Sequence, residues 1–264
     1  MITKKLLKNI KKVSKVVAKE KAAKKTVKKT AKKATSKAQK KTHVAIIVDQ
    51  SGSMESIKAE TISSINAQIK TIKKEAKKSN TSITLTLFSD KVEILKFANP
   101  LADQKELADK DYTPGGFTAM YDAIGMTVER MKKEIDDIND TETAVLVIII
   151  TDGQENASKT WSALDIAAVV KGLTATKRWT FTVLGANIDL AGLSETLGFA
   201  KSNIAKFTSN SRGVMRATNV TTSSVGNYFT TRNQTDDLAG SNISAQFYSP
   251  TEEITDTSDD SDKK

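Results

Sequence analysis

The 264-residue chain lacks cysteine and contains only one histidine and three prolines. Without cysteine there is no disulfide, no thiolate metal site and no cysteine nucleophile. The histidine, His43, stands at the start of an expected strand and is interpreted as structural, so a Ser-His-Asp or Cys-His site cannot be built conventionally. No apolar run is long enough for a transmembrane helix or a secretory signal. The length suits one domain with tails.

Basic charge is concentrated at the N-terminus. Residues 1–42 hold 17 lysines, no arginine and one acid, Glu20, a net charge of +16 against +10 for the whole chain, so the remainder carries −6. Such a segment cannot bury enough apolar surface to fold alone, and it is predicted to be disordered or helical only on a partner. The lysines expected to bind a polyanion are Lys24, Lys25, Lys28, Lys29, Lys32, Lys33, Lys37, Lys40 and Lys41.

This tail resembles, in composition alone, the lysine- and alanine-rich tails of linker histones and bacterial histone-like proteins. One interpretation is an arm that binds nucleic acid phosphates in a salt-dependent, sequence-indifferent way, and the other is a solvated extension. No aromatic residue interrupts it, so base stacking is not expected. Residues 1–18 also show an apolar stripe opposite lysines, which fits a helix at a membrane surface or one that forms on a partner. An organelle transit peptide is a further alternative, disfavoured because the segment has no arginine.

A buried strand at residues 44–48 leads into polar residues. The run Val-Ala-Ile-Ile-Val is typical of a parallel sheet covered on both faces, and Asp49, Ser51 and Ser53 follow it. An amphipathic helix over residues 57–76 comes next. Ligands of open α/β sheets collect beyond the carboxyl ends of the strands, so these three side chains are expected in that crevice.

Two further segments add oxygen donors to the same crevice. Residues 144–150 form a second buried strand that ends before Asp152, and a Gly/Pro loop at residues 113–118 ends with Thr118. A helix with an apolar stripe from Met120 to Ile138 follows the loop. Carboxylate and hydroxyl oxygens suit Mg²⁺ or Ca²⁺ and not a soft metal. Helix caps and turns are the structural alternative for these residues.

The set Asp49, Ser51, Ser53, Thr118 and Asp152 resembles the metal-ion-dependent adhesion site of von Willebrand factor A domains, also called integrin I domains. The resemblance covers roughly residues 43–230, and the ending of the region is similar to compact bacterial members. It implies Mg²⁺, with Ca²⁺ or Mn²⁺ as alternatives, touched by the serines and the threonine, while the aspartates bind the ion or its waters. Extracellular members often carry disulfides, so their absence favours the cytoplasm, with nucleoid association through the tail.

The resemblance implies a protein-binding module whose metal takes an Asp or Glu of a partner, such as an AAA⁺ ATPase or an assembly complex. A metal-dependent phosphoester hydrolase is the enzymatic alternative, disfavoured because the ligand loops lack lysine and arginine to bind phosphate. A third alternative is a nucleic-acid-binding protein in which the domain only recruits. Residues expected at the partner-binding rim are Gln50, Glu55, Phe117, Glu155 and Asn156.

The remaining pattern completes an α/β fold. Residues 82–89 and 92–97 predict an antiparallel hairpin, and residues 179–184 and 204–207 predict two more strands. Helices are predicted at residues 160–174, with Trp161, Leu164, Ala168 and Val169 buried, at 190–197 and at 211–229. The prediction is a doubly wound, mostly parallel sheet with one antiparallel edge strand and helices on both faces. Its domain spans residues 43–232, between the basic tail 1–42 and a polar, acidic, disordered tail 233–264.

Overall fold

The computed structural model describes residues 40–76, 79–189, 191–235, 244 and 246–248. These described residues belong to one compact unit. The predictions for residues 1–39 and for the acidic segment 249–264 lie outside the described residues. Among the described residues, no helix is both long and apolar enough to cross a bilayer.

A six-stranded sheet forms the centre of this unit, in the order β3-β2-β1-β4-β5-β6. Only β2 and β3 pair antiparallel, and β3 lies at the edge, which confirms the predicted fold class. Residue alternation in a strand sends successive side chains to opposite faces, so each buried strand serves two cores. The strands are β1 (Lys41–Asp49), β2 (Asn80–Phe88), β3 (Val92–Pro100), β4 (Thr143–Thr151), β5 (Trp179–Gly185) and β6 (Ile204–Lys206).

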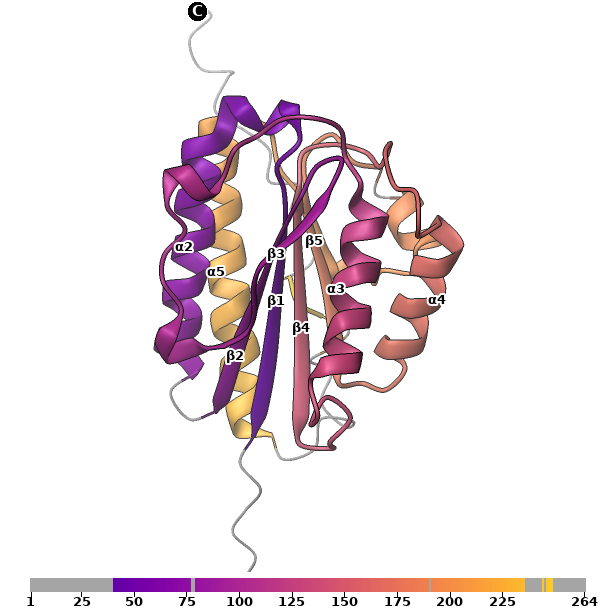
Figure 1. Ribbon diagram of the computed structural model, residues 1–264. Helices are drawn as coiled ribbons and strands as arrows, with labels where there is room; N and C mark the ends of the chain where they lie inside the picture. The colour runs from indigo at the N-terminus through magenta and orange to yellow at the C-terminus, as the bar shows by residue number, and fades with distance from the viewer. Residues whose placement is uncertain (1–39, 77–78, 190, 236–243, 245, 249–264) are drawn as a thin grey trace, which may run out of the picture. The chain divides into compact units, whose positions relative to one another are not determined.

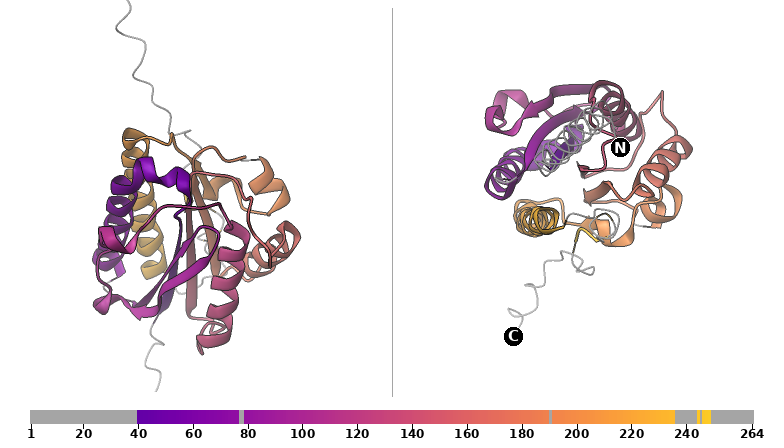
Figure 2. Two further views of the ribbon diagram at one scale, coloured as in Figure 1. Left: turned by 45° about the horizontal axis from the view of Figure 1, so that its top comes forward. Right: turned by 90° about the horizontal axis from the view of Figure 1, so that it is seen from below.

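Helices cover both faces of the sheet. Helices α2 and α5 lie on one face, and α3 and α4 on the other (Figures 1 and 2). The long helices are α2 (Lys58–Glu75), α3 (Met120–Glu134), α4 (Ala163–Thr174) and α5 (Ser211–Gln234). The short helices are η1 (Gly52–Ile57), η3 (Leu101–Asp103), η4 (Asp109–Asp111), the π-helical η5 (Gly192–Thr196) and η6 (Lys201–Asn203).

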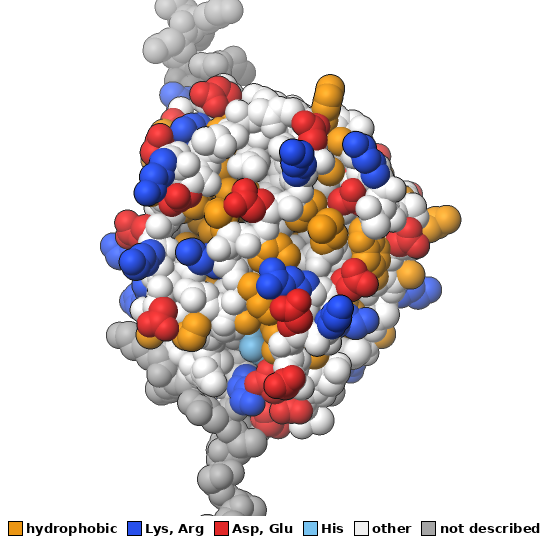
Figure 3. Space-filling model, viewed as in Figure 1, with side chains coloured by type: hydrophobic (Ala, Val, Ile, Leu, Met, Phe, Trp, Pro, Cys, Tyr) orange, Lys and Arg blue, Asp and Glu red, His pale blue; other side chains and the backbone are white. Residues whose placement is uncertain are grey.

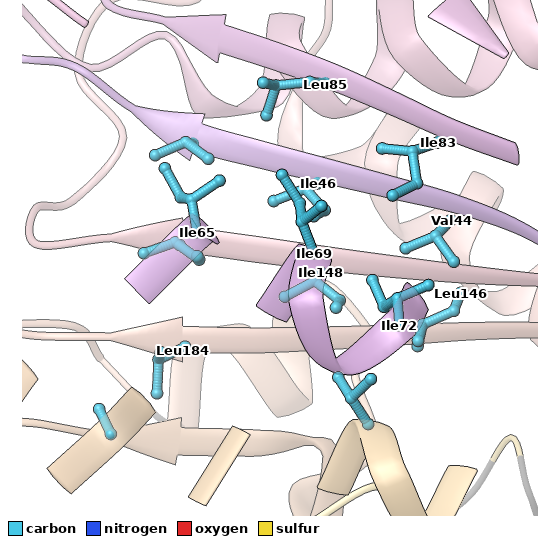
Figure 4. Packing of buried hydrophobic residues seen from close by; sticks show 14 of the residues in the cluster. Val44, Ile46, Ile65, Ile69, Ile72, Ile83, Leu85, Leu146, Ile148 and Leu184 are labelled. Carbon is cyan, nitrogen blue, oxygen red and sulfur yellow. The ribbon is translucent and has the colours of Figure 1, made fainter. Parts of the chain in front are cut away.

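Strand β1 contributes side chains to the cores on both faces of the sheet. Val44 and Ile46 face the α2 and α5 side, whereas Ala45 and Ile47 face α3 and α4. Ile69 of α2 packs against the first face, as Figure 4 shows. Each fully buried branched side chain of this kind contributes about 1.5–3 kcal/mol relative to exposure. The central strands are thus held from both sides, which fixes where their carboxyl ends lie.

The folded unit extends beyond the predicted limits of 43 and 232. Lys41 begins β1, and its ammonium lies 2.6 Å from Asp137. The ammonium of Lys40 donates to backbone carbonyls of residues 232, 233 and 235, at the end of α5. Both lysines were predicted to bind a polyanion, but in the structure they hold the base of the domain together.

The C-terminal limit moves for a different reason. Phe247 and Tyr248 lie beyond the predicted domain, yet both are buried in the core on the α2 and α5 side. The amide of Phe247 donates to the Asn203 side chain at 2.8 Å, and the Tyr248 hydroxyl lies 3.2 Å from that of Thr182. Two neighbouring aromatic residues in a polar stretch form no helix or strand pattern, so the sequence predicted that they belong to the disordered tail.

Helix α4 has a different buried face from the predicted one. It begins at Ala163 after the cap residue Ser162, and its buried residues are Ile166 and Val170. Leu164, predicted to be buried, is 79% exposed. The cap explains the difference, because the Ser162 hydroxyl accepts the amide of Asp165 and sets where the first turn begins.

Candidate metal centre

The candidate metal centre lies at the carboxyl ends of β1 and β4, which are neighbours in the sheet. Val48 pairs with Ile150, so Asp49 at the end of β1 and Asp152 just after β4 leave the sheet side by side. In a doubly wound sheet the crossovers leave β1 and β4 in opposite directions, which opens a crevice between them. The predicted loops meet in that crevice.

Asp49 is held from two sides. One carboxylate oxygen accepts the amide of Ser51 at 2.7 Å, and the other accepts the hydroxyl of Thr151 at 2.6 Å. The side chain is fully buried. Burial raises the pKa of Asp49 to about 6, although these two hydrogen bonds act to lower it; the nearby charge of Asp152 raises it further. Both hydrogen-bond donors to Asp49 are neutral groups, so neither brings a positive charge to offset its burial. A cation bound nearby would therefore stabilise the carboxylate strongly.

The two serines connect Asp49 to Asp152. The Ser53 hydroxyl donates to Asp152 at 2.6 Å, and the hydroxyls of Ser51 and Ser53 are 3.2 Å apart. Because the single hydroxyl hydrogen of Ser53 is directed at Asp152, the Ser51 hydroxyl is the donor in the second contact. The hydroxyl of Ser209, in the loop before α5, also reaches Asp152, at 3.4 Å. Four of the five predicted ligands therefore form one hydrogen-bonded chain.

Thr118 reaches the same place from the loop before α3. Its hydroxyl lies 3.5 Å from the point where a Cβ on Gly153 would stand, next to Asp152. The amide of Gly115 donates to the Gln50 carbonyl at 2.8 Å, and Gly52 donates to the Gly116 carbonyl at 3.0 Å. These backbone bonds join the Thr118 loop to the Asp49 loop. The structure thus brings all five predicted ligands to one end of the sheet.

The donor set fits a hard divalent cation. It offers two carboxylates and three hydroxyls, all oxygen, as Mg²⁺ and Ca²⁺ prefer. Both carboxylates are at most 3% exposed and bonded to hydroxyls and an amide. Within the part of the chain that the structure describes, no group of three or more His, Cys, Asp or Glu forms a metal cluster, so this centre depends on its hydroxyls.

Several supporting residues carried no sequence signal. The Tyr112 hydroxyl donates to the Asp49 backbone carbonyl at 2.5 Å. The side-chain amide of Asn187 donates to the backbone carbonyl of Asp152 at 3.3 Å. Asp90, in the β2–β3 turn, accepts the amide of Phe117 at 2.9 Å. Gly116 is required there, because its φ is +80° and a Cβ would come within 2.4 Å of Asp90. Thr151 could have been identified, since it ends the buried strand directly before Asp152.

The predicted rim divides into two groups. Phe117 is 66% exposed and Glu55 is exposed, while Gln50 is half-buried, so these three can meet a partner. Glu155 and Asn156 instead bind the Thr118 segment. The side-chain oxygen of Asn156 accepts the backbone amide of Thr118 at 2.8 Å, and the backbone amide of Asn156 donates to the Thr118 carbonyl at 3.0 Å.

Glu155 joins the loop after β4 to the start of α3. Its carboxylate accepts four hydrogen bonds, from the amides of residues 121, 157 and 158 and from the Ser158 hydroxyl, at 2.7–2.9 Å. Asp122, in the first turn of α3, joins the same two segments from the other side, because its carboxylate accepts the backbone amides of residues 159–161. An anion at the first turn of α3 is also favoured by the helix dipole. Glu155 therefore positions the ligand loops.

Comparison with known proteins agrees with this architecture. The family model of the von Willebrand factor type A domain matches residues 43–218, and the chain belongs to that family. A search of curated proteins found no match to this chain.

Three solved structures illustrate the similarity. A von Willebrand factor type A protein from Catenulispora acidiphila is 14% identical, with a TM-score of 0.51 over 72% of this chain and 43% of that one. The PilB minor pilin from Streptococcus sanguinis is 13% identical, with a TM-score of 0.50 over 72% and 62%. Manganese-loaded TRAP protein of Plasmodium vivax is 18% identical, with a TM-score of 0.45 over 64% and 69%. The chain spans less than half the length of the first of these, so the likeness concerns the fold.

Proposed function

We propose that this domain binds a partner protein in a cation-dependent way, by taking an Asp or Glu carboxylate of the partner at a Mg²⁺ ion in the candidate metal centre. Members of the family generally act as interaction modules. One observation carries the proposal: the hydrogen-bonded chain from Asp49 through Ser51 and Ser53 to Asp152 gathers buried carboxylates and hydroxyls at adjacent strand ends.

The residues of the centre have distinct tasks. Ser51, Ser53 and Thr118 would hold the ion directly, while Asp49 and Asp152 would bind it or its waters. Because the direct ligands are neutral hydroxyls, the bound ion keeps positive charge and can accept one more anionic oxygen. The bound ion supplies a Lewis-acidic position for a carboxylate of the partner. Phe117, exposed beside Thr118, would contribute apolar contact.

The test uses the full chain and two serine variants. Mg²⁺ should raise the unfolding temperature of the wild type, because an ion that binds only the folded state stabilises it. Ser53→Ala should remove this rise, and Ser63→Ala, an exposed serine on α2, should keep it. Immobilised wild-type protein should then retain a partner in Mg²⁺ and release it in EDTA. An equal temperature rise in wild type and Ser53→Ala would refute the metal centre.

The hydrolase alternative makes a different prediction with the same centre. The ligand loops at residues 50–54, 113–118 and 152–156 contain no lysine or arginine for a substrate phosphate. Turnover of a generic phosphoester that is lost in Asp49→Ala would favour the enzyme. We expect no such turnover.

The lysine-rich N-terminal segment supports a second element of the proposal, an anchor for nucleic acid or another polyanion. On the face of the folded unit seen in Figure 3, basic and acidic side chains are interspersed and not separated by sign. Replacing Lys28, Lys29, Lys32 and Lys33 by Gln should therefore weaken DNA binding and flatten its salt dependence. Replacing Lys132 and Lys133 of α3 is the control, and an equal effect would argue against the anchor.

A further inference from the structure

A cavity of about 180 Å³ opens beside the candidate metal centre. It lies between the loop after β4, the start of α3 and the segment after β5. Gly153 lines it and directly follows Asp152, and the Thr118 hydroxyl lies 3.5 Å from where a Gly153 Cβ would stand. The cavity and the metal centre therefore share one wall, made of a residue with no side chain. A partner segment bound at the centre would therefore lie next to the cavity.

The size of the cavity suits one long side chain. Ligand pockets for drug-sized molecules run to roughly 300–1,000 Å³, so this space is too small for them. Its walls are apolar and polar in about equal parts, and the apolar part comes from the start of α3 and from the segment after β5. The apolar lining residues are Met120, Tyr121, Ile188, Leu193 and Leu197.

The charges at the cavity have a single sign. Glu155 and Asp189 line it, and its described lining residues include no lysine or arginine. The Glu155 carboxylate is fixed by its four hydrogen bonds. Asp189 is exposed and accepts the amide of Ala191 at 3.0 Å. An acidic occupant would be repelled by both carboxylates, and a purely apolar one would leave them without a countercharge.

We propose that this cavity receives a lysine or arginine side chain of the partner, beside the carboxylate that the metal centre takes. The aliphatic stem of such a residue packs along apolar walls while its charged end stays near water and the carboxylates. The recognised element is then an acidic residue with a basic residue next to it in space, and a partner surface of acids alone is rejected. This inference rests on the proposed function for the acid, but the cavity can be tested without metal.

The first test titrates the full chain, in EDTA, with N-acetyl-lysine amide and with its uncharged analogue N-acetyl-norleucine amide. Methyl NMR signals of Ile188, Leu193 and Leu197 should shift with both probes, and lysine should bind about threefold tighter, as a partly exposed ion pair allows. Asp189→Asn should reduce lysine to the level of norleucine. Glu195→Gln, at an exposed carboxylate of η5 that does not line the cavity, should change nothing.

The second test uses short peptides that hold one Glu followed by Lys, norleucine or Glu, with Mg²⁺ present. The Glu-Lys peptide should bind tightest and the Glu-Glu peptide weakest. EDTA should reduce the Lys and norleucine peptides to the affinities of the single-residue probes of the first test, and it should abolish the binding of the Glu-Glu peptide. Equal affinity of the Lys and norleucine forms, or unmoved methyl signals in the first test, overturns the basic subsite. If EDTA leaves the affinities of the three peptides unchanged, the proposed function fails, whereas the first test still decides the cavity.

Discussion

Asp49 is fixed in three ways before any cation binds. Its two carboxylate oxygens accept hydrogen bonds from Ser51 and Thr151, and its backbone carbonyl accepts one from Tyr112. Burial raises the pKa of the Tyr112 hydroxyl well above its usual range, so this group stays a donor at any physiological pH. A ligand fixed in this way loses little conformational freedom on binding, which favours affinity for the ion.

Residue patterns predicted the ligands at this scale but not the groups that hold them. Asp49, Ser51 and Ser53 stand within one loop, so their spacing in sequence carries the signal. Tyr112 and Asp90 come from other loops, and their role depends on how those loops cross in space. Glu155 was predicted at the partner-binding rim because it follows Asp152 closely, yet its carboxylate faces the start of α3.

Replacing Glu155 tests whether it positions the loops or contacts the partner. Glu155→Gln places an amide NH₂ against groups that all donate hydrogen bonds, and the variant should lose about 1–3 kcal/mol of the free energy of unfolding. Urea denaturation measures this loss. Glu55→Gln, at an exposed residue of the same predicted rim, should stay within about 0.5 kcal/mol of wild type. Equal stability of the two variants would contradict a positioning role for Glu155.

At the scale of elements, the sequence predicted every long helix and every strand of the described unit. Continuous apolar runs marked β1 and β4, and helical periodicity marked α2 and α3. The buried face of α4 was predicted wrongly, with Leu164 inside. A 12-residue helix with many small apolar residues has no sharp apolar stripe, so the cap at Ser162 and packing against α3 decide its orientation.

A glycine pair tests how α3 meets the segment before α4. A Cβ on Gly125 would come within 2.1 Å of the Trp161 ring, so Gly125→Ala should destabilise the domain by about 1–3 kcal/mol through overpacking. Gly172 of α4 has open space at the same position, and Gly172→Ala should stabilise by about 0.5–1 kcal/mol through helix propensity. Thermal unfolding compares the two. A gain in stability for Gly125→Ala would show that α3 and Trp161 do not pack closely.

At the scale of the whole folded unit, its two ends have different tasks. The carboxyl ends of the strands carry the candidate metal centre, and the opposite end is closed by charged contacts. There, His43 lies 2.6 Å from the Ser82 hydroxyl and 3.0 Å from Asp137, which also pairs with Lys41. The interpretation of His43 as structural agrees with these contacts. Sequence could not show them, because Asp137 is 94 residues away in the chain.

This closed end should make stability depend on pH with a defined sign. Burial lowers the pKa of His43, more strongly than Asp137 raises it. The unfolded chain then binds a proton more readily than the folded one, so His43 contributes stability above pH about 6.5 that is lost as pH falls through its folded pKa. Burial acts to raise the pKa of Asp137, but hydrogen bonds from Lys41 and His43 outweigh it and lower that pKa; its contribution is lost only at more acidic pH.

The raised pKa of Asp49 makes stability change with pH in the direction opposite to that of His43. Because Asp49 is present in both wild type and His43→Gln, its contribution cancels when the two proteins are compared. The free energy of unfolding of wild type minus that of His43→Gln should be constant above pH 7. Between pH 6.5 and 5 it should fall, with a slope of at most about 1.4 kcal/mol per pH unit, since one proton is involved. Urea denaturation at pH 7.5, 6.5 and 5.5 measures it. A difference that grows on acidification would mean that Asp137 outweighs burial and that His43 is charged in the folded domain.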